Sequence, residues 1–372
     1  MKFEDVARRI TGMQVRSPLL FIGVFVIITL LMLPGMFRLV DHVEPSLEKV
    51  LPQEVDEVKT MNDMRAQFGA DMMYLVVYAE PPVHDVRTPG FVRYLDALTE
   101  KLRGREHIDA ATSIADTVVH QHGYIPDDAR LIEQTLDDPQ AERLMNMDYS
   151  FAVIQIRSDT GADAGTIGDV IEGIEQDIQS LEGLNPGSRI QVTGFNAIDR
   201  ATFEVIMSDF ARITLVSMAL VGIVVFLTFR KLGKTMMPMI VVITALLWTM
   251  GIVGYAGMTI TVVSMVAAAM IMGLGIDFGI HVVHGYYGLR KEGESGKDAL
   301  SKTMEELLRA MVGASLTTIA GFLALLFGVL PAMKNLGVIL GIGIFTTLLG
   351  AVFLLPAIVY MYDRRATGGI SQ

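Results

Sequence analysis

The stretch Met-Ile-Met-Gly-Leu-Gly-Ile-Asp-Phe-Gly-Ile-His, residues 270–281, decides how this chain folds. It is apolar enough to lie in a membrane, yet it carries an aspartate, Asp277, near its middle. A carboxylate in hydrocarbon is costly unless it is neutral, paired or facing water, so such a residue is by default functional. The stretch therefore predicts a membrane helix that carries a functional acid.

Composition extends this prediction to the whole chain. Of its 372 residues, 51% are hydrophobic and 19% are charged, and the mean hydropathy is +0.45, which indicates an integral membrane protein. Cysteine is absent, which excludes disulfides and thiolate metal sites. Residues 38–208 carry 14 Lys and Arg against 31 Asp and Glu, whereas the remainder carries 16 against 10. The acidic residues therefore gather in one block, and the net charge of −11 argues against nucleic-acid binding.

Apolar runs of about 20 residues predict six membrane spans. Their approximate bounds are 18–37, 210–229, 236–256, 260–283, 308–330 and 336–360. The predicted domains are a cytoplasmic amphipathic segment (1–16), the first span (17–38), an extracytoplasmic α+β block (39–208), the other five spans (209–362) and a cytoplasmic tail (363–372).

Basic residues set the predicted orientation, because Lys and Arg in short segments beside spans stay in the cytoplasm. They gather before the first span, between the second and third, between the fourth and fifth, and after the sixth: Arg8, Arg9, Arg16, Arg230, Lys231, Lys234, Arg290, Lys291, Lys297, Lys302, Arg364 and Arg365. Six spans put both termini on that same side. We therefore expect a multi-pass protein of the plasma membrane with cytoplasmic termini and an extracytoplasmic acidic block.

A cleaved signal peptide is the alternative interpretation of the first span, which has a basic start and an apolar run. No small-x-small cleavage site follows it, and its removal would break the agreement between span number and charge. The preceding residues Phe3, Val6, Ala7 and Ile10 recur at helical spacing and predict an amphipathic helix along the inner interface.

The acidic block has the pattern of a soluble α+β unit. Strands are predicted at 71–79, 108–114, 150–157 and 189–193, and helices at 89–102, 129–145 and 164–181. Two strand-helix-strand passes indicate a split β-α-β fold. A further helical pattern from residue 197 leads into the second span.

The fourth span arranges polar side chains on one helical face. Asp277, His281 and His284 follow at i, i+4 and i+7, with Gly273 one turn earlier. Asp and His are suited to a proton relay in a membrane. The alternatives are a structural hydrogen bond for Asp277 and interfacial anchoring for the two histidines.

Small and hydroxyl-bearing residues surround this face. Gly275 and Gly279 form a small-xxx-small pair that allows a helix to approach closely. The fifth span supplies hydroxyls as candidate neighbours of the acid, although such hydroxyls often bond to their own helix: Ser315, Thr317 and Thr318, followed by Gly321.

Other chemistries find little support. Asp277 and His281 alone offer too few ligands for a metal, so no metal site and no cofactor are predicted. The segment Gly233-Lys234-Thr235 lacks the preceding glycine and strand of a phosphate-binding loop. No nucleophile-base constellation is present, which argues against an enzyme.

The order of one span, a large outer domain and five spans resembles the resistance-nodulation-division (RND) superfamily. The motifs that carry the resemblance are Gly-Leu-Gly-Ile-Asp-Phe-Gly-Ile-His at 273–281 and Ser-Leu-Thr-Thr-Ile-Ala-Gly-Phe at 315–322. The closest branch looks like the hydrophobe exporters related to mycobacterial membrane-lipid (MmpL-like) transporters and Patched-like proteins. The resemblance covers nearly the whole chain and is strongest over residues 194–365.

This resemblance implies a carrier of lipids or other amphiphiles driven by the proton motive force, with a porter-like outer domain of ferredoxin-like units. It assigns the proton relay to Asp277 and the fifth-span motif to Thr317, Thr318, Gly321 and Phe322. Many lipid-transporting members have tyrosine after the acid, where this chain has Phe278. Most members also carry two such halves, whereas this chain corresponds to one.

A single half suggests a homodimer in which a two-fold axis brings two fourth spans together, with a homotrimer as the alternative. Two Asp277 carboxyls at that axis would bind protons as a coupled pair. The competing function is a non-transporting accessory or lipid-sensing protein of the same superfamily, Sec-accessory-like or sterol-sensing-like. The sequence does not identify the substrate.

Overall fold

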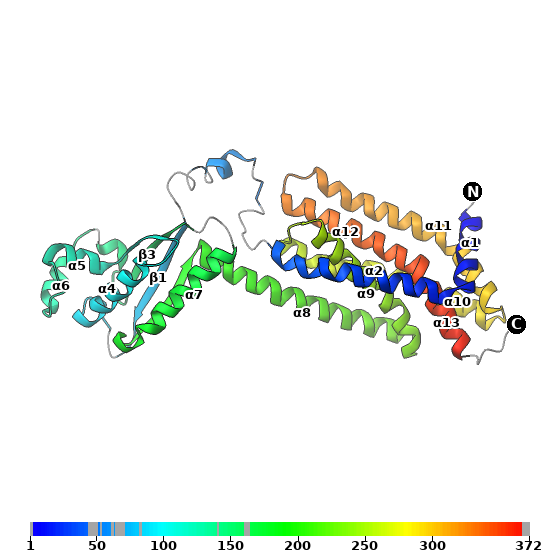
Figure 1. The fold of residues 1–372 in the computed structure, drawn as a ribbon, viewed down its shortest axis with the longest axis horizontal. Helices are drawn as coiled ribbons and strands as arrows, with labels where there is room; N and C mark the ends of the chain where they lie inside the picture. The colour runs from blue at the N-terminus through cyan, green and yellow to red at the C-terminus, as the bar shows by residue number, and fades with distance from the viewer. Residues whose placement is uncertain are drawn as a thin grey trace. The chain divides into compact units, whose positions relative to one another are not determined.

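A computed structural model describes residues 3–43, 51–52, 54–60, 63, 71–81, 84–139, 141–159 and 164–366 (Figure 1). The chain divides into two compact units. One comprises Met1–Pro52 with Val205–Gln372, and the other comprises Gln53–Glu204. The first unit holds the apolar helices and the second holds a β-sheet.

Six helices of the described residues are long and apolar enough to cross a membrane, as the apolar runs predict. They are α2 (Pro18–Arg38), the larger part of α8 (Phe195–Phe229), α9 (Leu232–Tyr255), η5 with α10 (Val262–Val266 and Ala267–Lys291), α11 with η6 (Gly296–Leu323 and Ala324–Phe327), and α12, η7 and α13 (Pro331–Leu349, Gly350–Leu354 and Leu355–Ala366).

Several helices extend beyond the apolar runs that predict them. Helix α11 begins at Gly296 instead of near 308, because Ser295 caps its first turn by accepting a hydrogen bond from the Asp298 amide at 3.1 Å. Helix α8 begins at Phe195, directly after the last strand. Helix α13 continues to Ala366, past the predicted end of the sixth span. A search for apolar runs therefore does not find the polar turns at the ends of these helices.

Helices α2 and α9 pack closely through glycines. A Cβ added to Gly35 would lie 2.4 Å from the Gly251 carbonyl oxygen, so neither backbone leaves room for a side chain. Three residues earlier on α9, Trp248 stacks on Phe25 with 4.7 Å between ring centroids, and its indole donates to Thr29 Oγ1 at 2.9 Å. Close backbone approach joined to one polar bond is typical of helix pairs in membranes.

The sixth span contains a π-helical turn at Gly350–Leu354, just before Pro356. In an α-helix the Val352 carbonyl would accept from the amide of residue 356, but proline has no N–H to donate. The side chain of Gln14 supplies the donor instead. Its Nε2 lies 2.8 Å from the Val352 oxygen and 3.1 Å from the Phe353 oxygen, and Gln14 is fully buried.

Gln14 belongs to the N-terminal helix α1 (Phe3–Arg16), which packs against α11 and α13. Arg8 also reaches α11, where its Nε and Nη2 each lie 3.1 Å from a carboxylate oxygen of Glu305. The amphipathic helix predicted for this segment is present. It packs against the helix bundle in addition to any contact with lipid headgroups.

The second unit contains one antiparallel four-stranded sheet in the order β2-β3-β1-β4. Along the chain its elements are β1 (Asp71–Ala79), α4 (Pro89–Arg103), β2 (Ile108–Thr112), α5 (Ile114–His122), α6 (Ala129–Leu136), η3 (Ala141–Leu144), β3 (Phe151–Ser158), α7 (Ala164–Ser180), η4 (Glu182–Leu184) and β4 (Ser188–Gly194). The two strand-helix-strand passes predicted from the sequence are therefore present.

Two local predictions in this unit are wrong. The second strand ends at Thr112, because Ser113 starts α5 with a capping box in which the Asp116 side chain accepts from the Ser113 amide at 2.8 Å. The predicted helix 129–145 splits into α6 and η3.

Glycine is required at position 194, where β4 ends. The chain has φ +113° there, and an added Cβ would lie 2.5 Å from the Met72 carbonyl oxygen.

Candidate functional site

Helix α10 turns its polar face outward. Asp277, His281 and His284 are exposed on the surface of this unit, as is Gly273. The opposite face, which includes Gly275, is buried against α9 and α12. The predicted polar stripe therefore exists, but it lies on the outside of the helix bundle of one chain.

Two glycines explain this rotation of α10. A Cβ added to Gly275 would lie 2.6 Å from Thr347 Cγ2 on α12. At Gly279 it would lie 2.7 Å from Pro238 Cβ on α9. Only the glycine face of α10 fits against these two helices. Asp277 lies on the other face and therefore points away from them.

Asp277 opens into a cavity of about 420 Å³ on the surface between α10 and α11, which we call the Asp277 cavity. Most of its lining is apolar. The lining residues are Leu274, Asp277, Phe278, His281, Leu307, Ala310, Met311, Ala314, Thr318 and Ile344. The structure thus brings Asp277, His281 and Thr318 together. Phe278, where many lipid-transporting RND members have tyrosine, contributes its ring to the wall.

Within the part of the chain that the structure describes, Asp277 makes no hydrogen bond or ion pair, and groups of three or more His, Cys, Asp and Glu able to hold a metal are absent. An ionised carboxylate beside apolar side chains, away from bulk water, pays a large desolvation cost. This carboxyl must therefore bind a proton, contact water or be covered by further polar groups.

The hydroxyls of α11 bond to their own helix. Thr317 Oγ1 donates to the Ala314 carbonyl at 2.9 Å, and Thr318 Oγ1 donates to the same oxygen at 2.8 Å. Since the Thr318 proton is already used, its oxygen can only accept from a group inside the cavity.

The other predicted site residues lie outside the cavity lining. Ser315 is fully buried, and its hydroxyl finds no partner among the described residues. A Cβ at Gly273 or Gly321 would meet nothing within 4 Å in this chain. Helix packing at these two glycines stays a prediction.

One polar cluster escaped the sequence interpretation. The Tyr286 hydroxyl donates to Asp363 Oδ2 at 2.9 Å, and Arg290 Nε donates to the same oxygen at 2.8 Å. The cluster joins the ends of α10 and α13. The i, i+4 spacing of Tyr286 and Arg290 was visible in the sequence, but their partner lies 73 or more positions away.

Known proteins resemble this chain over different lengths. The putative membrane protein MJ1562 of Methanocaldococcus jannaschii is 26% identical over 374 residues, which cover 98% of this chain and 96% of that protein. The putative membrane protein ActII-3 of Streptomyces coelicolor is 24% identical over 56% of this chain, and the sulfolipid-1 exporter MmpL8 of Mycobacterium tuberculosis is 28% identical over 31% of it. This chain covers only 32% and 11% of those two longer proteins.

The sequence profile of the MMPL family matches residues 49–368, which include the second unit, the last five membrane helices and both motifs beside the Asp277 cavity. The RND-type, MmpL-like resemblance inferred from those motifs is thereby confirmed. The protein has the apolar helices of a multi-pass membrane protein. The chain belongs to the MMPL family.

Proposed function

We propose that this chain is a secondary transporter that uses the proton motive force to move lipids or other hydrophobic or amphiphilic molecules. Family membership supports transport as the general activity, and one relative is named an exporter of a sulfolipid. The observation that carries the proton-coupled mechanism is Asp277, a carboxyl on a membrane helix that lacks a partner among the described residues and opens into a mostly apolar cavity.

Asp277 suits reversible proton binding in this setting. The protonated form is compatible with the apolar walls, and Thr318, whose hydroxyl donates to Ala314, lines the same cavity as a candidate acceptor. The ionised form needs water or another polar partner. Loss of the proton therefore changes what can cover the cavity. In this proposal the proton passes to His281, which lies one turn along the same helix and lines the same cavity. This difference between two protonation states is what couples a proton to a conformational change.

Orientation follows from charge. The basic segments next to the spans support cytoplasmic termini, and with that orientation the acidic second unit is extracytoplasmic. Its β-α-β-β-α-β order supports a ferredoxin-like porter domain. In this arrangement α8, which begins directly after β4, leads from the porter domain into the membrane.

The working form is a homodimer in this proposal. The outward face of α10, with Asp277 and Gly273, is poorly suited to lipid, and a second copy placed across a two-fold axis would cover it. MJ1562 matches this chain along nearly its full length, so the two proteins are of similar size. A homotrimer is the alternative.

Lack of cysteine makes the dimer simple to test. Gly273→Cys places a thiol on the polar face at a position with open space around it, so oxidation in membranes should give a disulfide-linked dimer. Gly90→Cys, which is exposed and equally open, is the matched control. The accessibility of the thiol in each variant is first checked with a thiol-reactive probe. If Gly273→Cys reacts with the probe but stays monomeric on oxidation, the two-fold contact is contradicted.

Transport is tested with purified protein in proteoliposomes. Transfer of fluorescent phospholipids with neutral, anionic or cationic headgroups is followed by dithionite quenching under a pH gradient of either sign. Asp277→Asn should abolish the gradient-dependent transfer, whereas Asp298→Asn, an exposed acid at the start of α11, should retain it. Undiminished transfer by Asp277→Asn would sink the proposal. Wild-type protein that moves none of the lipids alone would instead favour an accessory or sensing role.

A further inference from the structure

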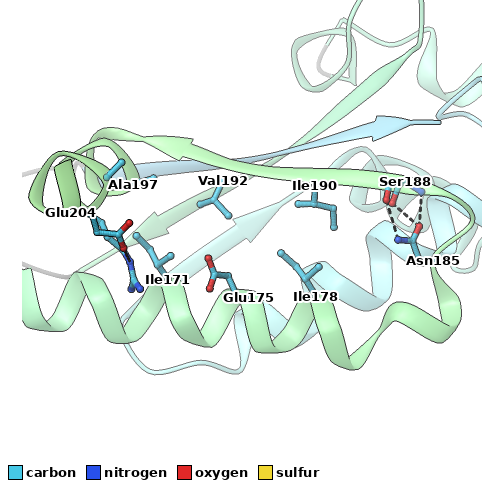
Figure 2. A pocket seen from close by; sticks show the side chains of 11 residues that line it. Ile171, Glu175, Ile178, Asn185, Ser188, Ile190, Val192, Ala197 and Glu204 are labelled. Atoms are coloured by element: carbon cyan, nitrogen blue, oxygen red, sulfur yellow. Dashed lines mark hydrogen bonds and ion pairs between the residues drawn. The ribbon is translucent and has the colours of Figure 1, made fainter. Parts of the chain in front are cut away.

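The second unit has an open groove of about 460 Å³, which we call the α7–β4 groove (Figure 2). Helix α7 forms one wall and strand β4 the other, and the first turns of α8 close one end. Its volume lies within the range of about 300–1,000 Å³ that small-molecule sites occupy. All of its lining residues belong to this one unit.

The groove exists because the sheet edge is incompletely covered. In the β1–β4 register Leu75 is opposite Val192, and Val77 is opposite Ile190. Leu75 and Val77 are fully buried under the helices, but Ile190 and Val192 are only partly buried. Since β4 has a paired neighbour on one side only, the apolar core of this unit opens to the surface along it.

The opposite wall carries a carboxylate between apolar side chains. On α7, Glu175 lies between Ile171 and Ile178, and all three point toward β4 (Figure 2). Among the described residues Glu175 makes no hydrogen bond or ion pair, and it is exposed. A second hollow continues along the same helix, shares Glu175 and Ile178, and adds Glu172 and Glu182.

The single basic side chain among the groove's lining residues is already engaged. Arg200 Nε lies 3.6 Å from Glu204 Oε1, and its Nη1 donates to the Gly168 carbonyl at 2.8 Å. Among the described residues, Glu175 is therefore left without a basic partner. The groove combines apolar side chains on its two long walls with polar side chains near its ends and a carboxylate whose charge is uncompensated. An elongated amphiphile with an apolar chain and a positive charge matches this arrangement.

We propose that the α7–β4 groove binds a cationic amphiphile, with the apolar chain against Ile190 and Val192 and the cationic head at Glu175. An anionic amphiphile of equal length would place its charge beside Glu175, Glu172 and Glu182 and is disfavoured. The claim that such an amphiphile is transported rests on the proposed function. Its binding in the groove does not involve Asp277.

Binding is measured on the full-length protein in zwitterionic nanodiscs. The probe is a dodecyltrimethylammonium that carries a photoactivatable diazirine in its chain, and labelled peptides are mapped by mass spectrometry. Labelling of the membrane helices serves as the internal standard for partition of the probe into lipid. We expect labelling within residues 171–204 that is displaced by unlabelled dodecyltrimethylammonium but not by a dodecyl sulfonate or a neutral dodecyl maltoside.

Two variants and one control separate charge from shape. Glu175→Gln should weaken labelling by about two- to fivefold, as expected for one exposed charge pair. Ala201→Trp, at an exposed position of the α8 wall, should block the groove and abolish labelling. Glu142→Gln, an exposed acid outside the groove, should change nothing.

The groove assignment is overturned if the sulfonate competes as well as the ammonium, if Glu175→Gln labels like the wild type, or if residues 171–204 are not labelled. The last result is also expected if a second copy occupies the groove. Asp277→Asn should label normally while its transport fails. Failure of the groove assignment and failure of proton-coupled transport are thereby measured separately.

Discussion

The hydrogen bonds from the Gln14 side chain to the sixth span predict an order of stability for variants of this contact. Gln14→Leu leaves the buried Val352 and Phe353 carbonyls without their side-chain donor, which costs about 1–3 kcal/mol. Part of this is recovered, because the Gln14 Oε1 is itself buried without a partner among the described residues. The net loss of unfolding free energy should be about 1–2 kcal/mol, or about 2–8 °C in Tm at the ~2–4 °C per kcal/mol typical of domains of 150–250 residues.

Two further variants set the scale for Gln14→Leu. Gln14→Glu places a carboxylate against two carbonyl oxygens in a buried site and should be more damaging. Arg8→Ala removes the ion pair with Glu305. Because the Arg8 side chain is 72% exposed, this variant should lose less stability than Gln14→Leu.

Thermal unfolding in detergent can be followed by fluorescence of the single tryptophan, Trp248, at the α2–α9 contact. The expected order of stability is wild type, Arg8→Ala, Gln14→Leu and then Gln14→Glu. Gln14→Leu that unfolds at or above the wild-type temperature would refute the role of the amide as a replacement donor at Pro356.

Further predictions concern a helix contact and an acid. Gly279→Ala should lower the unfolding free energy by about 1–3 kcal/mol, because the new Cβ meets Pro238, whereas Gly273→Ala should change it by less than about 0.5 kcal/mol; equal Tm shifts would contradict this contact. Burial alone would raise the pKa of Asp85, but hydrogen bonds from the Arg87 side chain and amide outweigh it and lower that pKa. The resulting stabilisation is present above the ordinary pKa of 3.8 and is lost as pH falls through the lower folded value, so Asp85→Asn should flatten the acid limb of the stability profile, and an unchanged limb would argue against the pair.

The membrane helices could be predicted from the sequence because an apolar run of about 20 residues has few other uses. The α-helical period likewise placed Asp277 and His281 on one face. The direction of that face could not be predicted, since it depends on which neighbours Gly275 and Gly279 approach. Those neighbours, Thr347 and Pro238, come from other helices.

The missed elements have physical reasons of their own. Helix α5 follows β2 with a single residue between them, so the apolar pattern assigns Ile114 to the strand. The signal for the start of a helix at this point is the Ser113–Asp116 capping box. The Gln14 bond spans 338 positions, and only Pro356, which leaves a carbonyl without a donor, pointed to it. The periodicity of a sequence predicts which residues share a face of one helix. It does not predict which helices, far apart in the chain, pack against each other.

The central claim is that Asp277 couples a proton to transport, and proton movement tests it most directly. Proteoliposomes loaded with pyranine report the change in lumenal pH when a transported lipid is added. The wild type and Asp298→Asn should both move protons with the lipid, and Asp277→Asn should move none. Proton movement by Asp277→Asn at the wild-type rate would contradict the account.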